Sequence, residues 1–320
     1  MKTTALYGSV QDDLGKVEEI FDSIKQVDYG PLGDMLDIVL SGGGKLLRPA
    51  LVLLSGRIAS YKLDLLVRLA ASVELLHTAT LVHDDVMDGA DTRRGRPTVN
   101  SAYNNSTTVM LGDYLFAHAA DEVAKTENIR AIRLFSQTLK VMAQGEIRQD
   151  IAAYDSRQTI RDYLQRIGGK TASLFATACE GGAIVSDAPE PWIEGMREYG
   201  YNFGMAFQIV DDILDFTGSE AELGKPAGSD LIQGTLTLPS FLLMENQPDS
   251  NPVQAYLGNR TTELLNEAIR AVRSSGVLDD SYQMARDFCD RAIESLSPID
   301  DSADRQTMID LANYILERKS

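Results

Sequence analysis

The sequence is poor in cysteine, in proline and in long apolar runs. Only Cys179 and Cys289 are present, in apolar surroundings and without metal-ligand spacing, so both are expected to be buried hydrophobic side chains. No unbroken apolar run reaches about 18 residues, so no transmembrane helix is expected. The N-terminal segment lacks the apolar core and cleavage site of a secretory signal. A cytoplasmic protein without stable membrane insertion is therefore expected.

Positive charge is also scarce. Lysine and arginine number 30 against 47 aspartates and glutamates, which gives a net charge of −17. Such a surface repels nucleic acid and anionic lipid, so no nucleic-acid partner is expected. An anionic ligand would need a local cluster of cations or a bound metal ion.

Strand signals are nearly absent, and the ten prolines are bunched. Long segments rich in leucine and alanine predict buried helices instead. The predicted helices span 62–83, 107–125, 129–152, 158–185, 192–216, 260–273 and 302–318. The predicted loops are 42–49, 89–100, 186–191, 217–239 and 246–252, and none has the composition of a flexible linker. We predict one all-α domain, residues 1–320, with about ten helices.

Two apolar helical runs end in the pattern D-D-x-x-D followed by glycine, at 78–91 and 205–218. Residues four apart share a helix face, and the glycines predict helix C-termini, where the helix dipole disfavours anions. A divalent cation removes both penalties, and Mg²⁺ prefers carboxylates, water and phosphate. One copy alone would suggest a solvated acidic helix end. Two copies predict facing helix ends that bind Mg²⁺ through Asp84, Asp85, Asp88, Asp211, Asp212 and Asp215.

Cationic side chains flank the first acidic cluster. Arg93, Arg94 and Arg96 follow it, and the upstream segment GGGKLLRP supplies Lys45 and Arg48. Guanidinium forks suit phosphate oxygens, whereas each of these groups taken alone would be read as an exposed, solvated side chain. His77 lies two helical turns before the cluster, so it is either a phosphate donor or a core histidine. His83 and His118 are expected to be core residues.

These motifs resemble those of the trans-isoprenyl diphosphate synthases, also called polyprenyl synthetases. The segments in family order are GGGKLLRPAL, ELLHTATLVHDDVMDGADTRRGRPTVN, LGDYLFAHA, GEIRQD, GGKTASLF, FGMAFQIVDDILDF and GKPAGSDLIQGTLTLP, and the terminal ILERKS resembles the family's basic tail. The resemblance covers almost the whole chain. It implies an isoprenoid-synthase bundle around a central catalytic cavity, and a homodimer.

The resemblance also implies roles for individual residues. Three Mg²⁺ ions per active site would hold the allylic diphosphate on the aspartates, with Arg93, Lys170 and Lys225 on its phosphates. The diphosphate of isopentenyl diphosphate would lie on Lys45, Arg48, His77 and Arg94. Thr171 and Gln208, beside Lys170, would present oxygen dipoles to the allylic cation. The implied reaction joins isopentenyl diphosphate to a geranyl, farnesyl or geranylgeranyl primer by ionisation, condensation and elimination.

Product length is expected to depend on the helix before the first cluster. In the family, bulky aromatics four or five residues before the first aspartate give short products, and here those positions hold the small Ala79 and Thr80. Leu76 lies one turn deeper, and Phe116 or Tyr114 would form a deeper floor, although core packing explains these aromatics equally well. The sequence thus favours a medium- or long-chain all-trans product.

Several alternatives stay open. A farnesyl or geranylgeranyl diphosphate synthase is the nearest. A terpene cyclase or head-to-head condensing enzyme is disfavoured, because GGGKLLRP and Arg94 imply a second diphosphate site. A non-catalytic partner subunit of a heteromeric synthase, or an acidic scaffold, would not need both clusters. Thr235 stands where many relatives have lysine, and no catalytic role is assigned to it.

Overall fold

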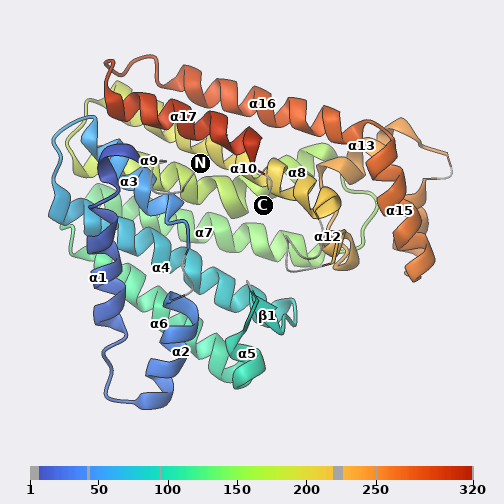
Figure 1. Ribbon diagram of the computed structural model, residues 1–320, viewed down its shortest axis with the longest axis horizontal. Helices are drawn as coiled ribbons and strands as arrows, with labels where there is room; N and C mark the ends of the chain where they lie inside the picture. Colours follow the sequence, from blue (N-terminus) through green and yellow to red (C-terminus); the bar gives the residue numbers. More distant parts are fainter. Residues whose placement is uncertain (1–6, 42–43, 94, 219–225, 250, 319–320) are drawn as a thin grey trace. The chain divides into compact units, whose positions relative to one another are not determined.

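The structure is a computed structural model that describes residues 7–41, 44–93, 95–218, 226–249 and 251–318 (Figure 1). The chain is 76% helical, so the all-α prediction is confirmed. Within the described residues the only sheet is a hairpin of β1 (Thr92–Arg93) and β2 (Arg96–Pro97). Arg94 and Lys225 lie outside the described residues.

The helices match the predicted segments closely, with extra helices between them. They are α1 (Leu14–Ile24), α2 (Gly30–Leu40), α3 (Leu47–Arg57), α4 (Leu63–Met87), α5 (Val99–Ala102), α6 (Asn105–Ala124), α7 (Ile129–Ile151), α8 (Ile160–Ile167), α9 (Ser173–Val185), α10 (Glu190–Thr217), α12 (Ser229–Ile232), α13 (Leu238–Asn246), α14 (Pro252–Gly258), α15 (Thr262–Ser274), α16 (Val277–Ser295) and α17 (Ala303–Glu317). A π-helical turn, Gly168–Ala172, divides α8 from α9.

All five predicted loops contain helical residues. Helix α3 already begins at Leu47, α5 begins at Val99, α10 begins within 186–191, α12 lies inside 217–239, and α14 begins at Pro252. Proline is compatible with the first helical turn, because the N–H that it lacks has no partner there, so the prolines at 49 and 239 did not mark loop residues. The helix number therefore exceeds the predicted ten.

The chain divides into two compact units. Unit 1 comprises residues within 1–138, 174–200 and 295–309, and unit 2 comprises those within 139–173, 201–294 and 310–320. Cys179 in the first and Cys289 in the second are buried, as predicted, and burial raises the pKa of both thiols to about 12.

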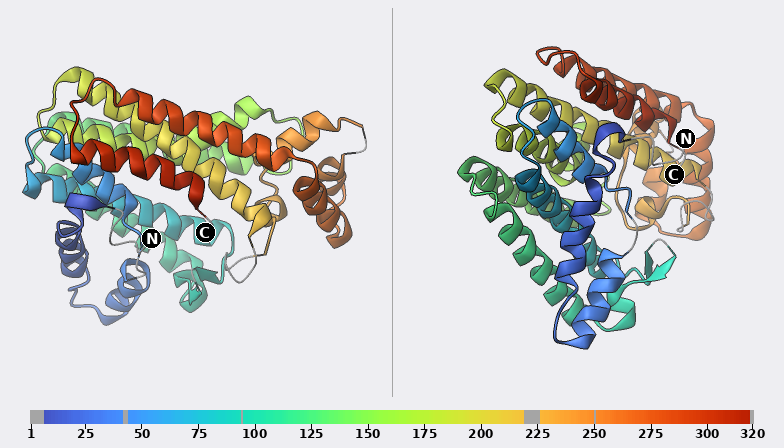
Figure 2. Two further views of the ribbon diagram at one scale, coloured as in Figure 1. Left: turned by 45° about the horizontal axis from the view of Figure 1, so that its top comes forward. Right: turned by 60° about the vertical axis from the view of Figure 1, so that its left-hand side comes forward.

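Helix α4 forms the centre of unit 1. Among the described helices it is the one long and apolar enough to cross a membrane, but 61% of its most apolar window is buried inside the protein. It lies beside α6 in each view (Figures 1 and 2). The two helices approach closely because Gly112 has no side chain: a Cβ there would stand 2.1 Å from Nε2 of His83. The ring of His83 also meets Phe116 edge-on, with centroids 5.4 Å apart.

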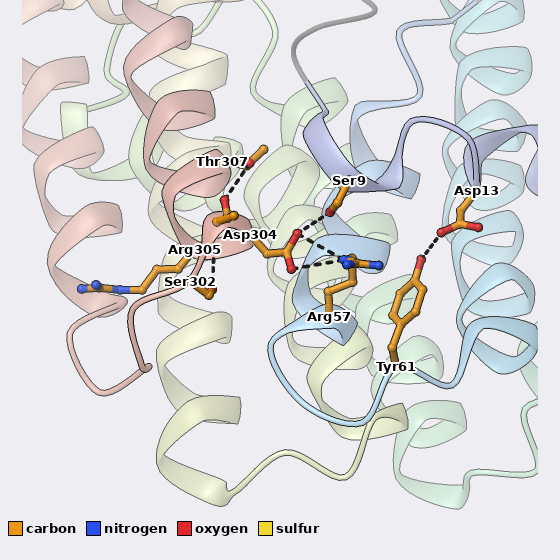
Figure 3. Close-up of polar contacts among 9 residues, drawn as sticks. Ser9, Asp13, Arg57, Tyr61, Ser302, Asp304, Arg305 and Thr307 are labelled. Carbon is orange, nitrogen blue, oxygen red and sulfur yellow. Dashed lines mark hydrogen bonds and ion pairs between the residues drawn. The ribbon is translucent and has the colours of Figure 1, made fainter.

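A polar cluster ties the N-terminal segment of unit 1 to the start of α17 (Figure 3). The Asp304 carboxylate accepts hydrogen bonds from Ser9 and from Nε of Arg57, at 3.1–3.2 Å for the arginine. Nearby, Tyr61 donates to Asp13 at 2.7 Å. The side chain of Asp304 is only 15% exposed, so these bonds lie largely out of solvent, where they stabilise most.

Unit 2 has its own apolar core around the end of α10. Tyr163, Phe216, Leu236 and Leu243 are fully buried there. Arg273 of α15 donates from Nε to the carbonyl of Phe216 at 2.6 Å, near the C-terminus of α10. That bond satisfies a carbonyl that the helix end leaves without a partner.

Candidate active site

The first acidic cluster lies at the C-terminus of α4, as its sequence predicted. Helix α4 ends at Met87, and Gly89 takes a left-handed φ of +60°. The carboxylates of this cluster have different environments: Asp88 is exposed and Asp84 partly exposed, whereas Asp85 is 6% exposed. Burial raises the pKa of Asp85, and its contact with Arg93 opposes that rise. Asp84 and Asp88 are therefore the members of this cluster that solvent reaches.

The β1–β2 hairpin places Arg93 on the buried carboxylate. Nε and Nη2 of Arg93 each lie 2.8 Å from Oδ1 of Asp85. The hairpin is anchored to the end of α4, because the Thr98 hydroxyl and the Asn100 amide both donate to the carbonyl of Ala90, at 2.7 and 3.0 Å. The side chain of Arg93 remains 39% exposed, so its outer edge can contact a ligand.

A cavity of about 450 Å³ opens beside this cluster in unit 1. Its lining combines three predicted site residues, His77, Asp85 and Arg93, with Lys25, which follows α1, and Glu74 of α4. Acidic and basic groups thus face one space. His77 was predicted either as a phosphate donor or as a core histidine, and its place on the cavity wall fits the former.

Arg48 is held in an unusual environment near the start of α3. Its guanidinium carbon lies 4.3 Å from the ring centroid of Phe175, and its Nε is buried with no hydrogen-bond partner among the described residues. Burial lowers the pKa of Arg48 to about 10, and the charge of Glu74 opposes that fall. The preceding turn is tight, since Leu46 takes a left-handed φ of +47°. Lys45 of that turn is exposed. The buried Nε of Arg48 can still donate a hydrogen bond, which suits an anionic ligand.

The predicted chain-length residues lie deeper in α4 and on α6. Ala79 and Leu76 are fully buried, whereas Thr80 is partly exposed and donates from its hydroxyl to the carbonyl of His77 at 2.7 Å. Phe116 contacts His83, and Tyr114 contacts His118, with centroids 4.6 Å apart. These contacts are compatible with both predicted readings, tunnel lining and core packing.

The second acidic cluster, at the end of α10 in unit 2, also divides into exposed and buried carboxylates. Asp211 has a 52% exposed side chain, whereas Asp212 and Asp215 are 3% and 2% exposed. Asp215 caps α12: Oδ1 accepts from the Ser229 hydroxyl at 2.8 Å and Oδ2 from the backbone N–H of Asp230 at 3.3 Å. Only Asp211 of this cluster faces solvent.

Asp212 belongs to a hydrogen-bonded chain that also contains two predicted catalytic residues. Gln208 donates from Nε2 to Oδ1 of Asp212 at 2.8 Å, and Thr171 donates to Oε1 of Gln208 at 2.7 Å. Tyr163 donates to the other carboxylate oxygen, Oδ2, at 2.7 Å. Burial raises the pKa of Asp212 to about 8, although both donors oppose that rise. The structure therefore brings Thr171, Gln208 and Asp212 together in one hydrogen-bonded chain.

Lys170 and Thr171 stand in the π-helical turn after α8. Lys170 pairs with Glu146 of α7 at 2.9 Å. The backbones approach closely here, since a Cβ on Gly145 would lie 3.1 Å from the backbone nitrogen of Lys170. Single π turns inside helices occur frequently at functional sites. The glycine of GEIRQD thus permits the contact that positions Lys170.

Three residues of the site had no role in the sequence-based account: Tyr163, Glu146 and Arg318. Arg318 lies 3.6 Å from Oδ1 of Asp211 through Nη2, and its guanidinium lies 4.2 Å from the ring centroid of Phe207. The resemblance of the terminal ILERKS to a basic tail was the available signal for Arg318. Tyr163 and Glu146 lie in α8 and α7, where sequence gave no sign that they touch Asp212 and Lys170.

The aspartates were predicted to bind Mg²⁺. Their arrangement fits a site in which substrate phosphate and water complete the ligands, rather than one made of protein ligands alone. Among the described residues, no three side chains of histidine, cysteine, aspartate or glutamate are grouped to hold a metal ion. Mg²⁺ commonly keeps several waters and binds one or two carboxylates together with substrate phosphate. The exposed pair Asp84 and Asp88, one helical turn apart, is suited to that use.

Comparison with known proteins shows extensive similarity. The polyprenyl synthetase family model matches residues 31–272. Heptaprenyl diphosphate synthase component 2 of Geobacillus stearothermophilus is 40% identical over 318 residues, which cover 99% of this chain and 99% of the relative. The crystal structure of heptaprenyl diphosphate synthase from Staphylococcus aureus superposes with a TM-score of 0.94 at 31% identity, covering 98% of this chain and 99% of that one.

A polyprenyl synthase from Caulobacter crescentus, solved in complex with calcium and isoprenyl diphosphate, is equally close in structure. Its TM-score is 0.94 at 32% identity, with 100% of this chain and 98% of that chain covered. That relative was thus solved with a divalent cation and an isoprenyl diphosphate bound.

Proposed function

This chain belongs to the polyprenyl synthetase family and is a prenyltransferase, and we propose that it extends an allylic diphosphate with isopentenyl diphosphate to a medium- or long-chain all-trans polyprenyl diphosphate. The names of the relatives, heptaprenyl diphosphate synthases among them, support this product class. The observation that carries the proposal is the placement of exposed carboxylates at the ends of α4 and α10, each beside cationic side chains.

We assign different tasks to the six aspartates. Asp84, Asp88 and Asp211 would bond Mg²⁺, because solvent reaches them. Asp85, Asp212 and Asp215 would act within the protein, since each accepts hydrogen bonds from protein donors. When bound, Mg²⁺ supplies positive charge that stabilises the departing diphosphate.

The second diphosphate, that of isopentenyl diphosphate, would bind on Arg48 and His77 with Lys45 beside them. The buried Nε of Arg48 has a hydrogen bond to give, and the nearby cavity offers space of about 450 Å³. Arg93 would contact the allylic diphosphate from its exposed edge, and Lys170 would leave or share its contact with Glu146 to do so. Arg94 and Lys225 keep their proposed phosphate contacts by resemblance.

The reacting carbon needs dipoles of the correct sign. Ionisation of the allylic C–O bond creates a carbocation, which oxygen lone pairs stabilise. The Thr171 hydroxyl donates its hydrogen bond to Oε1 of Gln208, so its oxygen lone pairs remain to face the cation. The double bond of isopentenyl diphosphate then forms the new C–C bond, and a proton is lost from the adjacent carbon to the departed diphosphate.

The experiment that tests the function combines purified protein with farnesyl diphosphate, labelled isopentenyl diphosphate and Mg²⁺. We expect all-trans products longer than geranylgeranyl diphosphate, and Asp84→Asn or Asp211→Asn should each abolish them. Control variants come from exposed aspartates far from the clusters in sequence, such as Asp249→Asn. A product that stops at farnesyl or geranylgeranyl length contradicts the medium- or long-chain assignment.

Product length has its own test at Ala79. This side chain is fully buried in α4, one turn before the acidic cluster. If this turn lines the tunnel, Ala79→Tyr blocks it and shortens the product. Unchanged length with normal turnover assigns Ala79 to core packing instead.

We further propose that the protein is cytoplasmic and forms a homodimer. Burial of α4 within unit 1 supports the first point. A heteromeric assembly is the second candidate, because the Geobacillus relative is named component 2. Val109 and Met110, 41% and 66% exposed on α6, are apolar surface that a partner would cover. Light scattering of the purified chain should give the mass of a dimer, and the same sample should be active. A chain that is inactive alone and becomes active only with a second protein contradicts the homodimer.

A further inference from the structure

Tyr163 is the most deeply buried member of the hydrogen-bonded chain that runs through Asp212 and Gln208 to Thr171. Its side chain is fully buried in unit 2, in α8, seven residues before Lys170. The ring packs against Phe241, with centroids 6.0 Å apart, and the guanidinium of Arg166 lies 5.5 Å from its centre. Arg166 is itself held, by donation to the carbonyl of Leu236 and, at 3.2 Å, to the side chain of Gln158. The tyrosine ring is therefore fixed by its surroundings.

The hydroxyl of Tyr163 fixes the carboxylate of Asp212. It donates to Oδ2 at 2.7 Å, while Gln208 donates to Oδ1 at 2.8 Å. Each oxygen thus has its own donor, which defines the rotation of the carboxylate about its Cβ–Cγ bond. Without the hydroxyl, Oδ2 would be buried without this donor and the carboxylate would turn to recover one.

The orientation of Asp212 in turn sets the orientation of the Gln208 amide. Against the ionised carboxylate of Asp212, a reversed amide would place Oε1 beside Oδ1, which brings two acceptors together. The amide therefore keeps Nε2 towards Asp212 and Oε1 towards Thr171, whose hydroxyl donates to it at 2.7 Å. Because the Thr171 hydroxyl donates its hydrogen bond to Gln208, its lone pairs, and not its proton, remain available to another group.

From this geometry we propose that Tyr163 is a positioning residue for prenyl transfer: through Asp212 and Gln208 it holds the Thr171 oxygen lone pairs in the orientation that stabilises the allylic cation. The inference rests on the proposed function, since it assigns to Thr171 the role of facing that cation. It concerns a stage after both substrates have bound. Loss of the hydroxyl should therefore lower kcat and leave the KM of isopentenyl diphosphate unchanged.

The first test replaces Tyr163 by phenylalanine. We expect kcat to fall about 10- to 100-fold, the range typical of a misplaced catalytic group, with little change in either KM. Tyr199→Phe is the matched control, because Tyr199 is also fully buried and donates its hydroxyl to a backbone carbonyl, that of Met308, at 2.7 Å. It should lower the unfolding temperature comparably while kcat stays near wild type. Both proteins are assayed well below their unfolding temperatures.

A double-mutant cycle with Thr171→Val tests whether Tyr163 acts through Thr171. Removing one preorganised dipole costs about 100-fold in kcat, so the single Thr171→Val variant sets the floor. If the hydroxyl of Tyr163 acts only by orienting Thr171, the double variant is no slower than Thr171→Val alone. Independent roles would instead multiply the two losses. Should Tyr163→Phe fail to fold, Gln208→Leu interrupts the same chain and takes its place in the cycle.

The conservative rescue is 4-aminophenylalanine at position 163, which keeps the ring and one hydrogen-bond donor. It should restore most of the kcat that phenylalanine loses. Multiplicative losses in the cycle, a wild-type kcat for Tyr163→Phe, or a loss confined to KM would each overturn the inference. A wild-type chain that transfers no prenyl group would instead refute the proposed function, so the two failures are distinct.

Discussion

Replacing Arg48 by methionine should raise the stability of the substrate-free protein while weakening its binding of isopentenyl diphosphate. The reason is that the buried charge of Arg48 destabilises the substrate-free protein, whereas a bound diphosphate would neutralise it. Its Nε is buried without a hydrogen-bond partner among the described residues. Methionine has a similar length, and its sulfur can pack on the Phe175 ring that the guanidinium now covers.

The size of the stability change follows from the pKa of Arg48. Burial lowers it from 12.5 to about 10, which corresponds to about 3 kcal/mol of destabilisation of the charged form. Removing the charge would stabilise the protein by that amount, but loss of the cation–π contact with Phe175 destabilises it by about 1–2 kcal/mol. The net effect is about 1–2 kcal/mol in favour of the variant. With an unfolding entropy of about 2 cal/mol/K per residue, 320 residues give a rise in Tm of about 2–3 °C.

The binding change has the opposite sign. Charged hydrogen bonds from Arg48 to a diphosphate are worth about 2–4 kcal/mol, so the KM of isopentenyl diphosphate should rise roughly 30- to 1,000-fold. Calorimetry of the free protein and initial-rate kinetics measure the two effects. The double variant Arg48→Met with Glu74→Gln is the control, because it removes the charge of Glu74 that otherwise loses its counter-charge. A lower Tm together with an unchanged KM would show that Arg48 serves packing alone.

Three further results should follow from the geometry. Asp304→Asn weakens the contact with Arg57 at 3.1 Å, and we expect a loss of about 1–3 kcal/mol with unchanged kcat, measured by calorimetry; a neutral substitution would contradict the importance of this anchor. Gly112→Ala places a methyl group 2.1 Å from Nε2 of His83. It should destabilise by about 1–3 kcal/mol, and adding His83→Ala should relieve it, whereas additive losses would locate the strain elsewhere. Burial raises the pKa of Asp212 from 3.8 to about 8, so between these values the folded state holds a proton that the unfolded chain releases. The free energy of unfolding of the wild type, compared with that of Asp212→Asn, should therefore fall as pH rises, by at most about 1.4 kcal/mol per pH unit. Melting temperatures measured in EDTA that change with pH in the same way for both proteins would refute this.

Much of the helical architecture was accessible from the sequence, because local composition determines it. The predicted helix 62–83 stopped four residues before α4 ends at Met87, whereas the glycines after the acidic clusters predicted C-termini close to the observed ends of α4 and, at Thr217, of α10. The break of the segment 158–185 at Gly168 was not accessible. The π turn lies where the backbone of α7 approaches at Gly145, and no local signal in 158–185 reports that approach.

The sequence by itself determined which residue types are proposed to act: two acidic clusters, the cations near each of them, and the threonine and glutamine proposed to face the allylic cation. Only the tertiary structure decided which of those groups face solvent. Asp84 and Asp85 are neighbours in one motif, yet one is partly exposed and the other lies beneath Arg93. Burial depends on the elements that pack over a side chain, such as the hairpin over Asp85 and α8 over Asp212, and these come from distant parts of the chain.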